Sequence, residues 1–531
     1  MTGKLRAQLA ADAELGAGNV VTRLLELGAD PDGPGLTFDV EVDGHPAWAA
    51  MTLGRLDERV NARAAWLHGQ GVRARDPIAV YVTSSADCFL SFMALNRLGA
   101  IPALMNPNIP IAIANEYIAK LRAVAVLTNP SRAVEHEQVW DVAESGTGDP
   151  AKAPKPFRHH QDDPIAITHS SGTTRMPTAV VHSHGSLFAA TRRIRLQGPR
   201  AQGTERVLSA LPAPHTAGIL TVNQALCNRA ELLFLSTQDD AGAILDAIER
   251  WKPTGVFGFA VTWAEMARHD LTRRDMDSVA IWFNTGDCAH EAHIRKLVAV
   301  GSHKTVTREG VVTVKGSTFY DGIGSTEMGH SAFHIGHRSD TNRYGRCVGK
   351  PHVFADVRIL DMETGEELPV GKVGHLGLKS PTLALGYWND HAQTFRTRYF
   401  GYYLTGDLMY RDEEGYYYHM DRVVDAVDLG GGDWLYTAMS EERILAANPG
   451  VRDCTVVAVN VGGRVVTDVL VLLADGATLD PQAVRSCLDD AAAATVRDVI
   501  PVTDADLVTG PTGKVRKFLM RQRHLQTLSN N

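Results

Sequence analysis

The stretch His169-Ser-Ser-Gly-Thr-Thr-Arg-Met-Pro177, continued by Thr178-Ala-Val-Val-His-Ser-His184, is the most informative segment of the chain. Two serines, a glycine and two threonines form a compact loop with free N–H and O–H donors. A backbone this unhindered can approach a polyphosphate closely, and each exposed group can donate a hydrogen bond. Because short Ser/Gly/Thr runs are also common in ordinary loops, the prediction of a phosphate site depends on three motifs further along the chain.

Around this loop, short apolar strand patterns alternate with helical patterns. The alternation predicts an α/β fold in which helices cover a mostly parallel sheet. We expect helices over 56–70, 87–98 and 240–251, and strands over 77–82, 101–105, 123–127, 207–211, 232–235 and 255–259.

From about residue 346 the pattern changes to that of β-hairpins. We therefore expect a large N-terminal core over 1–421 that ends in a β-rich subdomain over about 346–421. The remaining segment, 422–531, has the length of a small domain and is expected to form an α+β domain. Its predicted strands lie over 454–459 and 468–473, and its predicted helices over 440–447 and 481–493.

The composition is that of a globular protein with room for more than one domain. The chain has 531 residues, 44% hydrophobic and 21% charged, and a net charge of −8. Without a Lys/Arg block we expect no nucleic-acid partner, and without a long apolar run we expect neither a signal peptide nor a membrane span. The six cysteines are scattered, which predicts reduced thiols in a cytoplasmic protein. We also expect small-molecule partners and a monomeric or homodimeric state.

The second motif is Tyr320-Asp-Gly-Ile-Gly-Ser-Thr-Glu327. Its glycines let the backbone lie against a flat base, and Glu327 offers a hard oxygen ligand to Mg²⁺. The alternative interpretation is a helix start, with Ser325 or Thr326 as the cap and Glu327 in the first turn.

The third and fourth motifs are Leu404-Thr-Gly-Asp-Leu408 and Gly510-Pro-Thr-Gly-Lys514. Asp407 can accept hydrogen bonds from both hydroxyls of a ribose, although Thr-Gly-Asp is also typical of a hairpin turn. Lys514 on its Gly/Pro loop can reach into a cleft, and the alternative is an ordinary surface loop. The motif does not satisfy the pattern of a phosphate-binding P-loop. Four matches in one order argue against coincidence.

Together these motifs resemble those of the adenylate-forming superfamily, which includes acyl-CoA and aryl-CoA synthetases, luciferases and peptide-synthetase adenylation domains. The resemblance covers nearly the whole chain, and the form of the 321–327 motif is most similar to that of benzoate-type CoA ligases. It implies an ATP- and Mg²⁺-dependent, AMP-forming ligase, with CoA as a candidate second substrate. It also implies a mobile C-terminal domain that delivers Lys514 and then rotates about a hinge near Arg422.

The resemblance also implies a role for each motif residue. Lys514 would bridge the acyl carboxylate and the α-phosphate, with Glu327 and His215 as the other catalytic residues. A lysine and Mg²⁺ are needed because both reactants are anions that repel each other. The implied ATP-binding residues are Ser170, Ser171, Gly172, Thr173 and Thr174 at the phosphates, Asp321, Gly322, Ile323 and Thr326 around the base, and Asp407 and Arg422 at the ribose, with Glu327 and Thr173 as the metal ligands.

The acid pocket would be aromatic and apolar, which suits an aryl or short acyl acid. Its implied lining is His215, Phe257, Thr285, Gly286 and Asp287, closed by Gly324, Met328 and Gly329. His215 would flank the carboxylate, or be a loop histidine in water. Asp287 could recognise an amino or hydroxyl substituent, but a hydrogen-bonded structural carboxylate is the more economical interpretation.

The chain departs from the superfamily pattern at two places. The phosphate-loop lysine is replaced by Thr178, which leaves Arg175 as the candidate charge. Near the hinge a lysine is replaced by Asp428, and Asp428 and Asp433 would repel the phosphates of an incoming CoA. The thioester step is therefore less secure than adenylation.

Three hypotheses follow. The first is a ligase that adenylates a small, aromatic acid and passes the acyl group to CoA. The second keeps the fold but changes the acceptor or the acid, as in amide formation or a diazotase-like activation of nitrite for attack by an aryl amine. The third is a nucleotide-binding protein without turnover. A helical metal site at His330, His334 and His337 is given little weight, because no carboxylate or cysteine partner is fixed by spacing.

Overall fold

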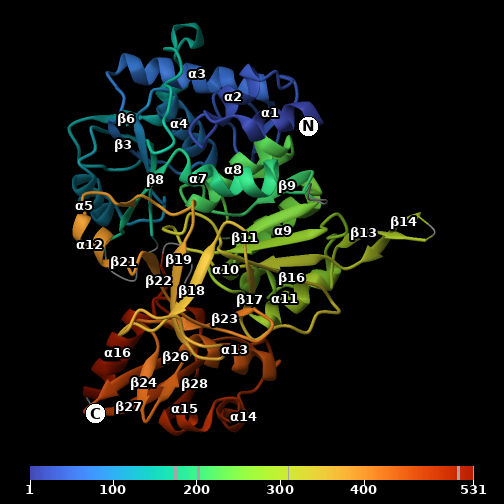
Figure 1. Ribbon diagram of the computed structural model, residues 1–531, viewed down its shortest axis with the longest axis vertical. Helices are drawn as coiled ribbons and strands as arrows, with labels where there is room; N and C mark the ends of the chain where they lie inside the picture. The colour runs from blue at the N-terminus through green and yellow to red at the C-terminus, as the bar shows by residue number, and fades with distance from the viewer. Residues whose placement is uncertain (171–175, 200–203, 239, 309, 511–514, 530–531) are drawn as a thin grey trace.

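The structure is a computed structural model that describes residues 1–170, 176–199, 204–238, 240–308, 310–510 and 515–529 (Figure 1). Two large sheets form the N-terminal part. The first has the order β20-β8-β7-β4-β3-β5-β6, with β3 to β7 parallel and β8 antiparallel to β7. Its strands are β3 Pro77–Tyr81, β4 Ile101–Leu104, β5 Ala125–Thr128, β6 Val139–Asp141, β7 Pro164–His169, β8 Ala179–Ser183 and β20 Gly386–Tyr387.

The second sheet has the order β18-β19-β22-β23-β17-β16-β15-β12-β11-β9-β10-β1-β2, with β21 against β22. From β1 to β15 the neighbours are parallel, and from β15 to β18 they are antiparallel, so the β-rich region is continuous with the parallel sheet. Its strands are β1 Pro34–Phe38, β2 Ala50–Thr52, β9 Arg206–Ser209, β10 Glu231–Phe234, β11 Gly255–Phe259, β12 Ile281–Thr285, β15 Thr318–Asp321, β16 Phe333–His337, β17 Cys347–Pro351, β18 Asp356–Leu360, β19 Gly374–Lys379, β21 Arg398–Tyr399, β22 Tyr402–Arg411 and β23 Tyr417–Arg422.

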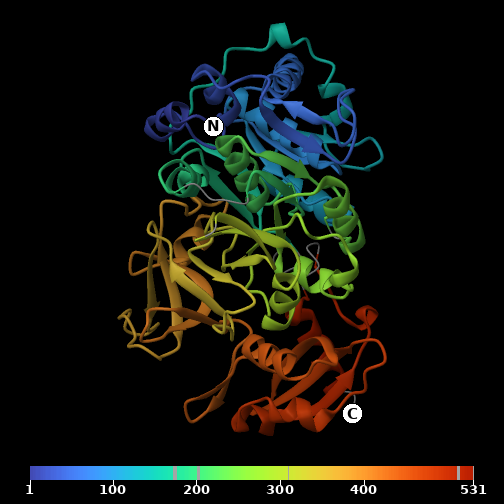
Figure 2. The ribbon, with the colours of Figure 1, turned by 90° about the vertical axis from the view of Figure 1, so that its right-hand side faces the viewer.

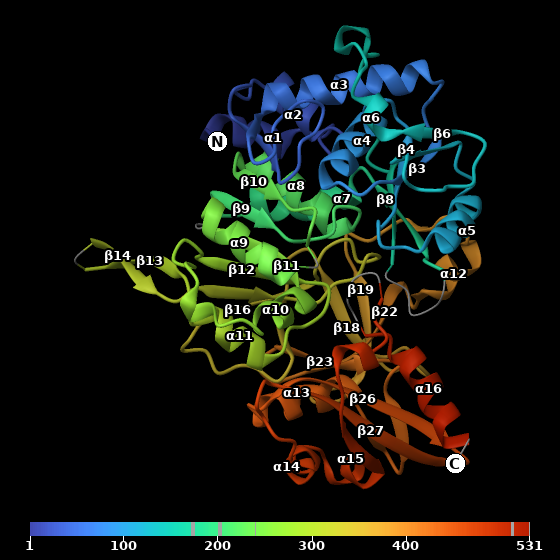
Figure 3. The ribbon, with the colours of Figure 1, turned by 180° about the vertical axis from the view of Figure 1, so that it is seen from behind.

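Helices fill the space between the two sheets and cover their outer faces (Figure 3). Between the sheets lie α1 Gly3–Ala11, α2 Val20–Glu26, α3 Leu53–Gly69, α4 Ser85–Arg97, α7 Ser186–Ala190, the π-helix η2 Thr191–Leu196 and α8 Thr216–Asn228. Outside lie α5 Ile111–Leu121 on the first sheet and α9 Ala241–Trp251, α10 Ala260–Met266 and α11 Glu291–Val298 on the second. The layers follow from the strand patterns, since alternate apolar side chains reach opposite faces.

Smaller elements complete this part of the chain: α6 Val142–Ser145, α12 His391–Arg396, and the short 3₁₀ turns η1 Pro150–Lys152 and η3 Leu271–Arg273. A hairpin of β13 Ser302–Thr307 and β14 Gly310–Lys315 projects from the side of the molecule (Figure 1). Among the described helices, none combines the length and apolar character that a membrane span requires.

The C-terminal elements form a separate lobe with its own core (Figure 2). They are β24 Val427–Gly430, β25 Asp433–Leu435, α13 Thr437–Ala447, β26 Val451–Val461, β27 Arg464–Leu473, α14 Pro481–Ser486, α15 Asp490–Thr495, β28 Val496–Pro501, η4 Asp504–Asp506 and α16 Lys517–Ser529. The prediction of one helix over 481–493 is wrong. The helix α14 ends at Ser486, the backbone of Asp489 is extended, and a new helix begins at Asp490.

Candidate nucleotide and substrate site

The polar loop of the first motif joins the antiparallel strands β7 and β8. Its base is closed by the Ser170 N–H, which donates to the Thr178 carbonyl at 3.1 Å. The buried His169 accepts from the Asn106 N–H through Nε2 at 2.9 Å, and burial lowers its pKa to about 4. Ser171, Gly172, Thr173, Thr174 and Arg175, the rest of the predicted phosphate loop, lie outside the described residues.

The second motif begins with a buried carboxylate that connects two loops. Asp321 accepts from Asn284 Nδ2 at 2.6 Å, the Gly322 N–H at 2.8 Å and the Ala289 N–H at 3.2 Å. Burial raises the pKa of Asp321 to about 6. Its side chain therefore ties the end of β15 to the segment after β12, and Gly322 and Ile323 follow from this fixed point.

The alternative of a helix start at Ser325 or Thr326 is wrong. The chain makes a turn there, in which the Gly329 N–H donates to the Thr326 carbonyl at 3.2 Å. Gly329 has φ +69°, and a Cβ at this position would lie 2.1 Å from the Thr382 carbonyl oxygen. Only glycine fits this approach, which holds the predicted pocket-closing residues Met328 and Gly329 against the 380–384 segment.

Glu327 follows the same turn, and its carboxylate oxygen Oε1 accepts from the Tyr387 hydroxyl at 3.2 Å. Its backbone carbonyl accepts from the Ala384 N–H at 2.9 Å. The half-buried Glu327 carboxylate has only a neutral hydroxyl as its side-chain hydrogen-bond partner. Its charged oxygens are therefore suited to binding Mg²⁺. Thr173, the second predicted ligand, lies outside the described residues.

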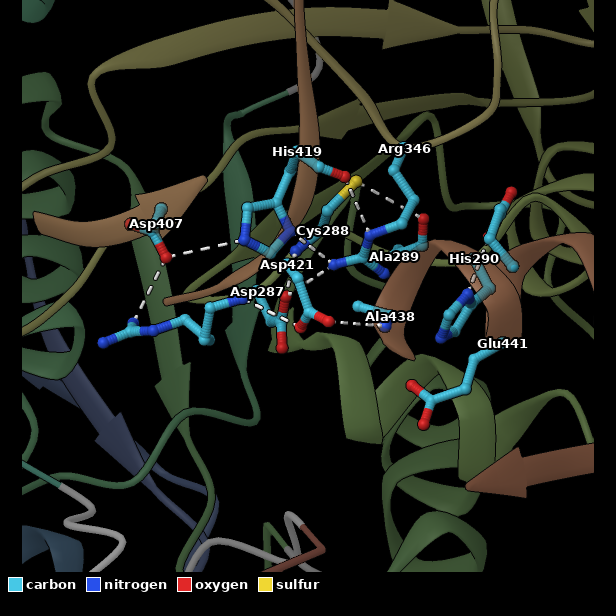
Figure 4. A network of polar contacts seen from close by, with 12 residues as sticks. Asp287, Cys288, Ala289, His290, Arg346, Asp407, His419, Asp421, Ala438 and Glu441 are labelled. Carbon is cyan, nitrogen blue, oxygen red and sulfur yellow. Dashed lines mark hydrogen bonds and ion pairs between the residues drawn. The ribbon is translucent and has the colours of Figure 1, made fainter. Parts of the chain in front are cut away.

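Asp407 lies inside strand β22, so the alternative of a hairpin turn at Thr-Gly-Asp is wrong. The carboxylate is buried, with Arg422 Nη1 at 3.3 Å and His419 Nε2 at 3.5 Å from Oδ1 (Figure 4). Burial raises the pKa of Asp407, but Arg422 and His419 more than offset this and hold it below its ordinary value. Within the described residues Oδ1 accepts no hydrogen bond, so this ionised acceptor fits the hydroxyls of a ribose.

A buried arginine connects this carboxylate to the predicted acid pocket (Figure 4). Arg346 Nη2 donates to His419 Nδ1 at 2.7 Å and to Asp287 Oδ1 at 3.2 Å. Since a guanidinium can only donate, the proton of a neutral His419 lies on Nε2, facing Asp407. Asp287 also accepts from the Cys288 N–H at 2.8 Å, which favours the structural interpretation of this residue.

The remaining pocket residues line the ends of parallel strands. Thr285 ends β12, and Gly286 follows with φ +90° while its carbonyl accepts from the Gly324 N–H at 3.2 Å. His215 precedes α8, where Nδ1 accepts from the Ala217 N–H at 3.2 Å. Its ring lies edge-on to Phe259 at 5.0 Å. A neutral His215 thus carries its proton on Nε2 and can donate to an anion.

An aromatic wall runs across three neighbouring strands. Phe257, Phe283 and Tyr320 are directly paired in the register of β11, β12 and β15. The first two rings stack at 4.3 Å and the last two at 5.4 Å. The sequence prediction included Phe257 but missed the other two, which the two-residue periodicity of adjacent strands could have indicated.

The C-terminal lobe contacts the core beside this site. Glu442 on α13 accepts from His290 Nδ1 at 2.6 Å and from the Glu291 N–H at 3.2 Å. Asp421 on β23 accepts from the Thr437 N–H and hydroxyl and the Ala438 N–H at the start of α13. Lys514 lies outside the described residues, while Lys517, three residues later, donates to Thr437 Oγ1 and Glu441 Oε2, both at 2.9 Å.

The three histidines with metal-ligand spacing do not share a helix, because residues 333–337 form strand β16. In the part of the chain that the structure describes, no group of three or more His, Cys, Asp or Glu side chains is arranged to hold a metal ion. The histidines instead form an aromatic group, in which His352 stacks on His334 at 4.5 Å and lies edge-on to His330 at 5.5 Å.

Residues 31–388 match a family described as AMP-binding enzyme. The chain is 42% identical to a 3-aminoavenalumate diazotase from a Streptomyces species, over 98% of this chain and 97% of the relative. It is 25% identical to the 3-amino-2-hydroxy-4-methoxybenzoate diazotase of Streptomyces cremeus, over 75% of this chain and 78% of the relative.

The fold is shared with a solved structure, the anthranilate CoA ligase AuaEII in complex with anthranoyl-AMP. The TM-score is 0.81 at 20% identity, over 98% of this chain and 99% of the other. The similarity extends over the large N-terminal part and the small C-terminal α+β domain, as the sequence pattern predicted.

Proposed function

The chain belongs to the AMP-binding, adenylate-forming enzyme family and is an ATP-dependent, AMP-forming enzyme, and from that premise we propose that it is a diazotase. It adenylates nitrite and transfers the nitroso group to the amine of an aminoaryl acid. The observation that carries the proposal is the 42% identity with a diazotase over 98% of the chain. It supports the nitrite alternative over the acid–CoA ligase that the motifs alone placed first.

The proposed reaction balances without an oxidant or a reductant. An oxygen of nitrite attacks the α-phosphorus of ATP, pyrophosphate leaves, and the product is a mixed anhydride, AMP–O–N=O. The amine nitrogen then attacks the nitroso nitrogen, the N–O bond to AMP breaks, and AMP leaves with the bonding pair. The nitrosated amine first loses one proton from nitrogen to give the N-nitrosamine, and the remaining N–H proton then moves to the oxygen to form Ar–N=N–OH. This species takes up one further proton and expels water to give the diazonium group.

Nitrite presents the same electrostatic problem as a carboxylate, because both are small bent anions with two oxygens that must approach a triphosphate. The cationic Lys514 and the Nε2–H of His215 would offset that repulsion for either anion. Asp407 and Arg422 would hold the ribose, and Glu327 would hold Mg²⁺, which supplies charge neutralisation at the phosphates. Catalysis then consists of positioning and charge, with no protein nucleophile.

The surface expected to face CoA also supports another acceptor. Asp428 and Asp433 are exposed on the hairpin of β24 and β25, and Asp428 Oδ1 accepts from the Gly430 N–H at 2.8 Å. Two carboxylates there repel the phosphates of CoA. An acid–CoA ligase remains the second candidate, favoured by the fold shared with the anthranilate ligase.

The test supplies ATP and Mg²⁺ with ¹⁵N-nitrite and aminoaryl acids, and in parallel the same acids with CoA. We expect pyrophosphate release that requires nitrite, and a diazo product that retains the amine nitrogen and gains one ¹⁵N by mass spectrometry. Pyrophosphate release without nitrite, together with a CoA thioester, would instead establish the acid–CoA ligase.

A further inference from the structure

Arg195 places a cation beside the aromatic wall without an acidic partner. It lies on η2, where Nε donates to Gln224 Oε1 at 3.0 Å and the guanidinium lies over the Phe283 ring at 6.0 Å. No Asp or Glu among the described residues forms an ion pair with it. Burial lowers the pKa of Arg195, and Tyr320 partly offsets this. A half-buried cation without a counter-charge loses part of its solvation without compensation, so an anionic ligand suits this position.

The surroundings of Arg195 are suited to the end of an aryl acid. Arg195 and Phe257 line one small cavity together with Thr221, Gln224 and Ala225 of α8. The wall of Phe257, Phe283 and Tyr320 rings faces the same layer of helices, because alternate residues of these strands, such as Trp282, pack in the opposite core. A flat aryl ring can lie against this wall, with its carboxylate at Arg195.

The neighbouring imidazoles do not compete for that carboxylate. His330 and His352 lie close enough to Arg195 for its charge to act on them. Burial lowers the pKa of His330 to about 4 and that of His352 to about 3, with smaller contributions from neighbouring charges. Both rings are therefore neutral near pH 7, and Arg195 supplies the positive charge at this end of the pocket.

The other end of the wall is the nucleotide end. Two residues further along each strand, on the same face, stand Phe259, Thr285 and Gly322, next to His215 and the 321–327 turn. Two residues of a strand span about 6.6 Å. That length matches an aryl acid whose amine and carboxylate lie at opposite ends of the molecule.

We propose that Arg195 binds the carboxylate of the aminoaryl acid at the end of the aromatic wall remote from the nucleotide. The amine then faces the adenylylated nitrite, whereas an acid-activating ligase must bring the carboxylate itself to the α-phosphate. Arg195 is thus a specificity-determining residue, and the substrate class is aryl acids with an amine and a carboxylate at opposite ends. The inference rests on the proposed diazotase function.

The experiment compares Arg195→Met with the wild type on 3- and 4-aminobenzoate, 3- and 4-aminocinnamate and aniline, at saturating ATP and nitrite. We expect the wild type to prefer at least one acid over aniline by about 30-fold or more in kcat/KM, the scale of a charge-assisted hydrogen bond. Arg195→Met should remove that preference through a rise in KM for the acid. It should leave kcat/KM for aniline and the KM for nitrite within about twofold of the wild-type values. Arg195→Lys should restore part of the preference.

Arg193→Met is the matched control, since Arg193 is an exposed arginine on the same π-helix that contacts Gln197; it should behave as the wild type. An equal loss on acids and aniline in Arg195→Met would show a structural role and overturn the inference, as would an unchanged preference. If the wild type forms no diazo product with any amine, the proposed function itself fails. That outcome is visible before any variant is made, so the two failures are distinguishable.

Discussion

The two ends of the substrate site treat charge in opposite ways. At the nucleotide end, carboxylates such as Asp321 and Glu442 are buried and matched by fixed donors. At the far end of the aromatic wall, Arg195 has a glutamine and an aromatic ring as neighbours, and the described residues offer it no carboxylate. The completed networks fix the geometry of the protein itself, whereas in our proposal the charge of Arg195 is left for the carboxylate of the substrate.

The largest effect is expected where both ends must cooperate, at Lys514. Lys514→Ala should lower kcat for pyrophosphate release by about 100- to 1,000-fold, because the charge that offsets repulsion in the transition state is lost. ATP affinity, measured by calorimetry, should stay near the wild-type value. Lys372→Ala, at an exposed lysine, is the control. Full turnover by Lys514→Ala would contradict the charge-based mechanism at both ends.

Gly329→Ala tests how rigid the nucleotide end is. The new Cβ would meet the Thr382 carbonyl at a backbone with φ +69°, so we expect a loss of about 3 kcal/mol or more in the free energy of unfolding by urea. Gly345 has φ +68° and open space around a Cβ, so Gly345→Ala should cost only about 1 kcal/mol. Equal costs would mean that the 326–329 turn yields easily.

Glu442→Gln tests the charge pairing between the lobe and the core. Burial lowers the pKa of His290, but Glu442 more than offsets this and raises it above 6.5; burial raises the pKa of Glu442, but His290 more than offsets this and lowers it below 4.5. The pair is therefore complete between about pH 4.5 and 6.5. It weakens as pH rises through the raised pKa of His290, and as pH falls through the lowered pKa of Glu442.

Thermal unfolding measured from pH 5 to 9 should show this dependence in the wild type. Glu442→Gln should cost about 1–2 kcal/mol at pH 6 and flatten the decline above it. Glu414→Gln, at an exposed glutamate of the β22–β23 hairpin, provides the control. An undiminished pH dependence in Glu442→Gln would assign the titration to other groups.

The smallest effect is expected at Asp287, which the network assigns to structure. The Asp287 side chain is 43% exposed, and its partner Arg346 retains the hydrogen bond to His419 when Asp287 is replaced. Asp287→Asn should therefore cost less than about 1 kcal/mol in stability and leave the ranking of aminoaryl acids by kcat/KM unchanged. A tenfold change in that ranking would make Asp287 a recognition residue and extend charge selection to the nucleotide end.

Elements with a strong local period were predictable from the sequence. Strands β3, β4 and β11 lie where apolar runs indicated them, and α9 begins where Asp240 caps the Ala243 N–H. The break between α14 and α15 was missed because helical periodicity continues across Asp489, whose backbone conformation is not a property of the pattern.

The candidate site could be proposed from the sequence only where it rests on a local motif. Asp407 and Glu327 could be named from their neighbours, but Arg346 and His419 become partners only through the pairing of β17 with β23. Arg195 sits in an Arg-Arg-Ile-Arg run that has the pattern of a solvated helix face. Only the packing of η2 between the two sheets turns it toward the aromatic wall.

Asp421 and Arg422 are consecutive residues whose side chains contact different parts of the molecule. The first holds the start of α13 in the small lobe, and the second holds the acceptor assigned to the sugar. One peptide unit joins the two residues, so a backbone rotation that separates α13 from Asp421 also moves Arg422. The end of β23 therefore couples the position of α13 mechanically to the contact between Arg422 and Asp407.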